Sequence, residues 1–226
     1  METAELEKLI KGRRSIRFWD DKPVPEELLL KAVELASWAP NGANAQIWNF
    51  YIVLDKSKIK AIGDAAAANM KNMMSWPEMA NFKGFTPPPP PPGVEPPPPP
   101  KRSPLSDAPA MILIGAKRRE NPMDKMIAER AKTDEQAAQR LQWSGAIDSR
   151  IQSVASGIGY LLLVLHQMGL GATWMTGPIS QAKGDIEKIL NVPPDVDIIA
   201  LVPVGYSTYT PVSFRKLVND VCQVIK

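Results

Sequence analysis

The stretch Arg13-Arg14-Ser15-Ile16-Arg17-Phe18 places three guanidinium groups close together in the chain. Such groups repel one another unless an anion lies among them, and planar Arg donors with a neighbouring Ser hydroxyl bind phosphate well. The cluster therefore predicts a ligand that carries a phosphate. A solvated basic helix end, or a patch that contacts nucleic acid, fits these residues equally well when they are considered alone.

The second informative segment is an amide-rich loop at 39–50, Ala-Pro-Asn-Gly-Ala-Asn-Ala-Gln-Ile-Trp-Asn-Phe. It lies between a helix expected over 25–38, which has an apolar stripe and ends before Pro40, and a strand expected over 50–54. Amides donate and accept hydrogen bonds without carrying charge, which suits the edge of a neutral heteroaromatic ring. An ordinary Asn/Gly turn is the alternative.

Two later segments complete a pattern. The segment 169–178 (GLGATWMTGP) follows a long apolar stretch, and Pro203-Val204-Gly205-Tyr206 precedes Arg215. In this order and at this spacing, the four segments resemble the flavin-dependent nitroreductase family, whose N-terminal pattern joins Arg-Arg-Ser-x-Arg-x-Phe to Ala-Pro and Asn-x-Gln-x-Trp-x-Phe. The resemblance covers both ends of the chain and fails across about residues 70–108.

The resemblance implies a fold and an assembly. The fold is α+β: a nitroreductase-like three-layer α/β/α sandwich with a mostly antiparallel central sheet, formed by a single domain over residues 1–226. Family members commonly build each flavin site across a homodimer interface, so the resemblance also implies a homodimer in which a C-terminal tail embraces the partner. The alternation of strands and helices, taken alone, fits a parallel doubly wound sheet as well.

The resemblance also assigns residues to the cofactor FMN. It implies that Arg13, Ser15 and Arg17 hold the phosphate and ribityl end, with Arg14 nearby, and that Arg215 returns to the phosphate. Asn44 would bond the isoalloxazine edge, and a backbone N–H at Thr176 or Gly177 would approach flavin N5. No side chain is expected to be catalytic, because the flavin carries the reaction. The implied cofactor-binding set is Arg13, Arg14, Ser15, Arg17, Pro40, Asn41, Gly42, Asn44, Gln46, Met175, Thr176, Gly177 and Arg215.

The remaining elements follow from periodicity. Further strands are expected at about 109–116, 172–176 and 196–204, and further helices at about 56–73 and 180–190. From about 133 to 168 the chain lacks proline and becomes apolar nearly all round, which predicts one long buried helix. The resemblance makes this helix the core of the dimer.

Composition argues against several classes of protein. The net charge of +3 calls for no nucleic-acid partner, and neither a signal peptide nor a stretch of about twenty apolar residues points to a membrane. We therefore expect a cytoplasmic protein. Cys222 is the only cysteine, so an intrachain disulfide is precluded. His166, the only histidine, is interpreted as structural, and no catalytic triad, Walker loop or metal site can be assembled with it.

An insertion at about 75–104 departs from the family. Residues 87–92 and 96–100 are all proline, which precludes a helix or a sheet ladder. The segment can be a spacer, a lid over the flavin or a ligand for a proline-binding domain. We favour a lid, because the aromatic residues Trp76, Phe82 and Phe85, just before the first run of prolines, would pack on a flat aromatic substrate.

Together these features predict an FMN-dependent oxidoreductase. Hydride would pass from NADH or NADPH through flavin N5 to an electron-poor small molecule, such as a nitroaromatic, a quinone or an enone. Two alternatives stay open. One is a specialised flavoenzyme of the same fold, namely a dehalogenase, an azoline oxidase or a flavin-consuming enzyme. The other is a non-catalytic flavin-binding scaffold that recruits partners through the proline-rich arm.

Overall fold

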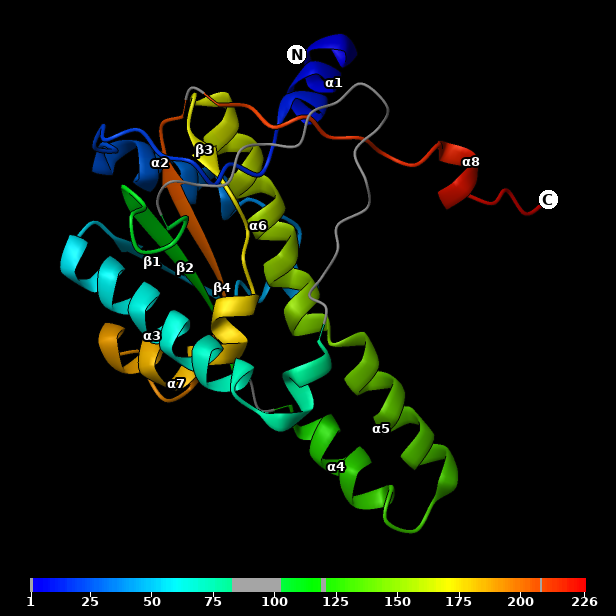
Figure 1. Ribbon diagram of the computed structural model, residues 1–226. Helices are drawn as coiled ribbons and strands as arrows, with labels where there is room; N and C mark the ends of the chain where they lie inside the picture. Colours follow the sequence, from blue (N-terminus) through cyan, green and yellow to red (C-terminus); the bar gives the residue numbers. More distant parts are fainter. Residues whose placement is uncertain (1, 83–102, 119–120, 208) are drawn as a thin grey trace.

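Four strands form one sheet in the order β1-β2-β4-β3 in the computed structural model, which describes residues 2–82, 103–118, 121–207 and 209–226 (Figure 1). The strands are β1 (Trp48–Val53), β2 (Ala110–Lys117), β3 (Gly171–Ala172) and β4 (Val196–Gly205). Each neighbouring pair is antiparallel. This confirms the α+β class and the antiparallel sheet, and it excludes the parallel doubly wound alternative.

Helices cover both faces of this sheet and make the three layers. α2 (Glu26–Ala36) and α6 (Ser149–Gln167) lie on one face, and α3 (Lys56–Met74) and α7 (Gly177–Leu190) lie on the other. The remaining helical elements are α1 (Thr3–Gly12), α4 (Pro122–Arg130), α5 (Glu135–Ile147), α8 (Val218–Val221) and the short 3-10 helices η1 (Gly42–Asn44) and η2 (Pro77–Asn81).

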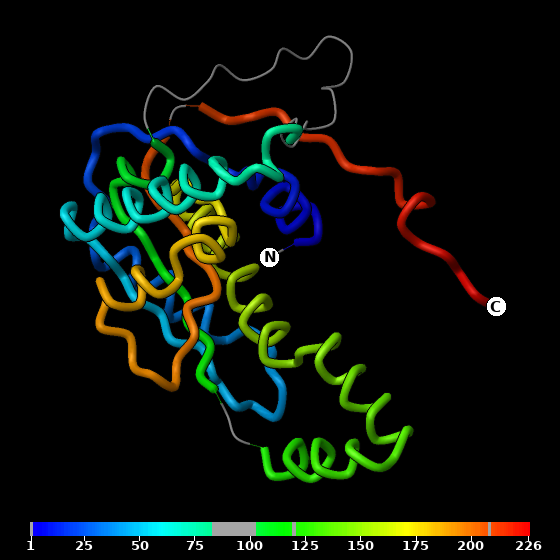
Figure 2. The backbone as a smooth tube through the Cα atoms, turned by 60° about the horizontal axis from the view of Figure 1, so that its bottom comes forward, coloured from blue at the N-terminus to red at the C-terminus, as the bar shows by residue number. Residues whose placement is uncertain are grey.

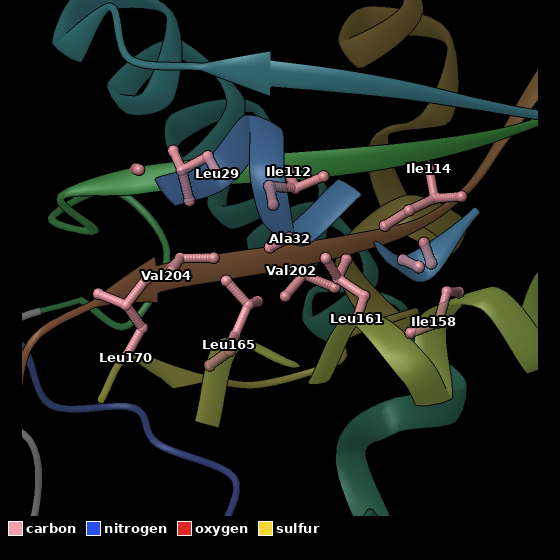
Figure 3. Close-up of a cluster of buried hydrophobic side chains, with 14 of the residues drawn as sticks. Leu29, Ala32, Ile112, Ile114, Ile158, Leu161, Leu165, Leu170, Val202 and Val204 are labelled. Carbon is pink, nitrogen blue, oxygen red and sulfur yellow. The ribbon is translucent and has the colours of Figure 1, made fainter. Parts of the chain in front are cut away.

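The larger apolar core lies between the sheet and the α2/α6 layer. Alternate residues of β2 and β4, among them Ile112, Ile114 and Val202, point at Leu29 of α2 and Leu161 of α6 (Figure 3). All five are fully buried. Burying side chains of this size contributes roughly 1.5–3 kcal/mol each, so this contact fixes how α6 lies on the sheet.

The second core lies under α3 and α7 and is shaped by a β-bulge. The register of β2 against β4 shifts between Ile114 and Gly115. A shift of one residue exchanges the two faces of a strand. Ile198 and Leu201 of β4 are three positions apart, so in a regular strand they would point to opposite faces of the sheet. Because of the shift, both face the second core.

The long helix predicted over 133–168 is wrong as a single element. Asp148 adopts the left-handed backbone conformation (φ 34°, ψ 77°) and separates α5 from α6. Its side chain accepts a hydrogen bond from the Ile151 amide and so caps α6. α4, which the sequence did not predict, packs against α5, and the two project from the body as a helical hairpin (Figures 1 and 2).

Of the last two strands, β4 agrees with the strand predicted at 196–204, and β3 differs from expectation. The strand predicted at 172–176 is shorter, because β3 ends at Ala172 and only an isolated bridge joins Met175 to Leu201. After β4 the chain extends away from the body, with α8 near its end (Figures 1 and 2). The apolar side chains of this tail are exposed: Val212, Phe214, Leu217, Val218, Val221, Val224 and Ile225.

Candidate functional site

The N-terminal basic segment lies at the β3 edge of the sheet. Ser15 forms a parallel bridge with Ala172, and the Ile16 amide donates to the Ala172 carbonyl at 3.0 Å. A Cβ on Gly171 would lie 2.8 Å from the Ile16 side chain, so only glycine permits this approach. The fold thus brings the predicted phosphate-binding residues beside the segment that leads to Met175, Thr176 and Gly177.

Three arginines and a histidine gather there from three parts of the chain. Burial lowers the pKa of Arg13, and the positive charges of Arg215 and Arg14 lower it further. Burial also lowers the pKa of His166, again with contributions from Arg13 and Arg14. The tail therefore brings Arg215 within electrostatic range of Arg13, although the two residues are far apart in sequence.

This cationic cluster fits a phosphate. In the described part of the chain no carboxylate pairs with Arg13, Arg17 or Arg215. Among the described residues, Arg14 donates only to the backbone carbonyls of Lys11 and Arg13, and Arg215 only to Ser213 and Phe214 beside it. Like charges held together without a counter-ion are unfavourable, and a dianionic phosphate would reverse the sign of that interaction.

The amide-rich loop has a backbone that few sequences adopt. Ala43, Asn44 and Gln46 have φ of 53°, 50° and 46°, in the left-handed region. The Asn41 carboxamide holds the loop closed, because its oxygen accepts from the Gln46 amide at 2.8 Å. Gln46 in turn donates to the Asn44 side chain at 3.3 Å. Non-glycine residues in this region cost about 1 kcal/mol or more each, and such strain clusters at ligand sites.

Two serines of α6 fasten this loop to the body. Ser153 Oγ accepts from the Gly42 amide at 3.2 Å, and Ser156 Oγ donates to the Pro40 carbonyl at 2.7 Å. Neither serine was predicted from the sequence. Hydroxyls spaced by three residues on one helix face were a visible signal, but their partners lie more than a hundred residues earlier in the chain.

The cationic cluster and the amide loop lie toward opposite ends of α6. Ser153, which holds the loop, is near the N-terminal end, and His166, beside the arginines, is at the C-terminal end. The step of thirteen positions from Ser153 to His166 corresponds to about 20 Å along the helix axis. One chain therefore presents two separate groups of predicted cofactor residues, and the structure does not bring them together within that chain.

A cleft of about 750 Å³ lies between the amide loop, the start of α6 and the α4/α5 hairpin. Gly42, Ala43 and Ile47 line it from the loop, Leu141 from α5 and Arg150 from α6. A volume of this size accommodates a small organic molecule. The arginine cluster does not line it.

Arg150 is held by Asp197 of β4 in a network beside the cleft. Asp197 accepts from Arg118, Arg150 and Lys183 at 2.6, 2.8 and 3.0 Å. The hydrogen bonds from Arg118, Arg150 and Lys183 hold the pKa of the Asp197 carboxyl far below its usual range. The network ties α6, α7 and the residue after β2 to the start of β4, and it fixes the wall of the cleft that Arg150 forms.

The predicted substrate residues are only partly described. The start of the insertion forms η2, with Trp76 and Phe82 on either side of it, and their side chains are 51% and 42% exposed. Phe85 and the proline-rich stretch lie outside the described residues. Within the described ranges, no group of His, Cys, Asp and Glu residues could hold a metal ion, and no helix is long and apolar enough to cross a membrane.

The sandwich, the phosphate-fitting arginines and the strained amide loop are features of a flavoprotein of the oxidoreductase class. More narrowly, the chain belongs to the nitroreductase family, whose sequence model matches residues 10–206. The family expected from the sequence is thereby confirmed.

Two curated relatives indicate how varied this family is. An iodotyrosine deiodinase of Thermotoga neapolitana is 27% identical over 205 residues, covering 88% of this chain and 86% of the relative. A putative NAD(P)H nitroreductase of Bacillus subtilis, YfhC, is 25% identical over 209 residues, covering 91% and 86%. Different activities thus occur at the same level of similarity.

Solved structures agree with the fold. A BluB-like flavoprotein from Clostridium difficile 630 superimposes with a TM-score of 0.75 at 21% identity and full coverage of both chains. An iodotyrosine deiodinase bound to FMN and 3-iodo-L-tyrosine superimposes with a TM-score of 0.64 at 24% identity, covering 94% of this chain and 95% of the other.

Proposed function

We propose that the protein is an FMN-dependent oxidoreductase that passes hydride from NADH or NADPH to an electron-poor small molecule. The observation that carries this proposal is the cationic cluster of Arg13, Arg14 and Arg215, which has no acidic partner among the described residues. A phosphate supplies the missing negative charge. The family supports FMN as its source, and a related deiodinase structure binds FMN.

The residues of this chain would bind and orient the cofactor rather than exchange protons with the substrate. Arg13, Ser15, Arg17 and Arg215 would hold the phosphate by charge-assisted hydrogen bonds. When bound, FMN supplies a ring that accepts and returns a hydride at N5. α7 begins at Gly177, whose amide has no hydrogen-bond partner among the described residues, whereas the Ile179 and Ser180 amides donate to the Thr176 carbonyl. The Gly177 amide would therefore be available to that edge of the ring.

The amide loop would set the orientation of the flavin ring. Asn44 and Gln46 offer uncharged donors and acceptors, and the strained backbone keeps them in one arrangement. We assign Pro40, Asn41 and Gly42 to the same surface, and Met175 and Thr176 to the opposite group beside Ser15. The adjacent cleft, with Ile47 and Leu141, would admit the electron acceptor.

We infer that the protein acts as a homodimer. The two groups of predicted cofactor residues lie about 20 Å apart along α6, so a second copy could bring its amide loop to the arginine cluster of the first. The exposed apolar tail supports the same assembly, since it would be buried against a partner. We take residues 1–226 to form one domain with an insertion at about 75–104, and we expect a cytoplasmic location with neither nucleic acid nor membrane as partner.

A reductive dehalogenase of the same fold is the second candidate. It is favoured by the deiodinase relative, whose match covers 88% of the chain against 91% for the nitroreductase. An azoline oxidase, a flavin-consuming enzyme and a flavin-binding scaffold remain further alternatives, and the arm that a scaffold would use lies outside the described residues.

The test is the visible absorption spectrum of the purified protein, with the pigment released by acid, identified, and exposed to NADH or NADPH without oxygen. We expect FMN that bleaches with a reduced nicotinamide and is reoxidised by a nitroaromatic or a quinone. FMN that bleaches only with dithionite and is reoxidised by 3-iodotyrosine would favour the dehalogenase. A colourless protein that takes up no added FMN would contradict the whole proposal.

A further inference from the structure

His166 lies at the C-terminal end of α6, directly against the end of α1. A Cβ built on Gly12, the last residue of α1, would lie 3.0 Å from His166 Nε2. The imidazole therefore faces the point where the chain leaves α1 and enters the arginine cluster. In the described part of the chain neither ring nitrogen has a hydrogen-bond partner.

The charged groups that act on this imidazole are cations. Arg13 and Arg14 act on it directly, and Arg215 acts on Arg13. α2 also packs on α6, through buried apolar residues, and its charged side chains Glu26, Glu27, Lys31 and Glu34 are exposed. α1, against which the imidazole lies, carries Glu5, Glu7, Lys8 and Lys11, all of them exposed, and Glu7 pairs with Lys11. β3, a further neighbour at this end of α6, carries no charged residue. The sole histidine thus lies in a site built to receive an anion.

We propose that His166 is a fourth cationic group for the cofactor phosphate and takes up a proton from solvent when that anion binds. This inference rests on the proposed function, because FMN supplies the phosphate. Without a ligand, burial and the two arginines lower the pKa of His166, so the imidazole is neutral at neutral pH. A phosphate held among the same groups favours the protonated form instead.

The sign of the pH dependence follows from linkage. The ligand raises the pKa of His166, so the affinity that this residue adds is fully present below the pKa of the free protein. It is lost as the pH rises through the pKa of the complex. Each unit by which FMN raises this pKa corresponds to about a tenfold gain in affinity. The phosphate itself loses a second proton at about pH 6, which strengthens binding as the pH rises.

Because the chain has one histidine, NMR can follow its ring directly in the whole protein. We would titrate the imidazole resonance between about pH 5 and 9 in the free protein, with FMN, and with riboflavin, which has the same ring system but no phosphate. We expect FMN to raise the pKa of His166 and riboflavin to leave it unchanged. An unchanged pKa with FMN bound would overturn the inference and leave the proposed function standing, whereas a protein that binds no FMN would overturn both.

A variant gives an independent measurement. We expect His166→Gln to weaken FMN binding more at about pH 5.5 than at about pH 8, so the ratio of the variant's Kd to that of the wild type falls as the pH rises. Riboflavin binding should be equal in the two proteins. Gln167→Ala, at the exposed neighbouring position, is the matched control and should give a ratio near one throughout. A ratio for His166→Gln that does not change with pH would overturn the inference, since it would show a purely structural role.

Discussion

Arg13 combines partial burial with like-charged neighbours, so its removal separates binding from stability. We expect Arg13→Ala with Arg17→Ala to weaken FMN binding by about a hundredfold or more, because each charge-assisted hydrogen bond to a phosphate is worth roughly 1.5–3 kcal/mol. The free energy of unfolding of the FMN-free protein should stay equal or rise, since a repulsion is relieved. Flavin content and urea unfolding measure the two quantities.

Lys11→Ala is the matched control for this double variant. Lys11 lies two residues before Arg13, in the last turn of α1, and pairs with Glu7 in an exposed ion pair. Such pairs contribute little, about 0–1 kcal/mol, so FMN content should not change. Full flavin occupancy in the double variant would show that the phosphate binds elsewhere.

Asp197 supplies a pH dependence of stability. Its pKa in the folded protein is lowered by three cationic donors, so its contribution is present above the unfolded pKa of about 3.9 and declines as the pH falls below it. We expect Asp197→Asn to lower the free energy of unfolding by about 1–3 kcal/mol at pH 7. The difference from the wild type should shrink below about pH 4.

Urea titrations at several pH values check this expectation. Asp195→Asn is the control, because Asp195 pairs only at 3.4 Å with Lys117 and both side chains are at least half exposed. Its effect should stay within about 0.5 kcal/mol. A difference for Asp197→Asn that is the same at pH 3 and pH 7 would contradict the assigned role of the network.

The sequence predicted those candidate site residues that lie close together in the chain, but not those that packing brings together. Arg13 and Ser15 lie within one short stretch, so their clustering is visible in the sequence. His166 and Ser153 become part of the site only because α6 packs on the sheet, and nothing local to either residue encodes those partners. The glycines at 12 and 171 were the indirect signal, since each permits a close approach of two segments.

At the scale of elements, the amide loop is held from outside by α6. We expect Ser156→Ala to loosen the loop by removing its bond to the Pro40 carbonyl, at a cost in stability of about 1 kcal/mol. In the flavin-loaded protein the visible absorption bands should shift and FMN should dissociate faster. Ser156→Thr keeps the hydroxyl and should restore both properties. An unchanged flavin spectrum in Ser156→Ala would show that the loop does not contact the ring.

The break between α5 and α6 shows where periodicity fails. The pattern over 133–168 has no proline and reads as one helix, yet Asp148 leaves the helical region and caps α6 through the Ile151 amide. The Asp-Ser pair at 148–149 is typical of a helix start, but it is also tolerated inside helices. Packing determines that the helix breaks at Asp148. α6 is fixed on the sheet by Leu161 and its neighbours, whereas α4 and α5 have no buried residue.

For the whole molecule, the C-terminal tail would connect assembly to cofactor binding in the proposed dimer. A chain ending at residue 209 would lack Arg215 and the exposed apolar residues of the tail. We expect it to sediment as a monomer at concentrations where the full chain is a dimer, and to purify without flavin. Arg215→Ala in the full chain should lose affinity for FMN but remain dimeric. A truncated chain that stays dimeric would show that α6 and the body alone hold the assembly.

The arginine cluster and the amide loop, at opposite ends of α6, are two half-sites of the proposed cofactor site. Their separation has a genetic consequence. A chain with alanines at 13 and 17 and a chain with a disrupted amide loop are each expected to be inactive alone. If a dimer draws one half-site from each copy, mixing them reconstitutes one wholly intact site in every mixed pair. Equal amounts of the two defective chains would then recover about a quarter of the normal number of sites by random pairing. Mutations in this protein should therefore fall into two complementing groups, one for each end of α6.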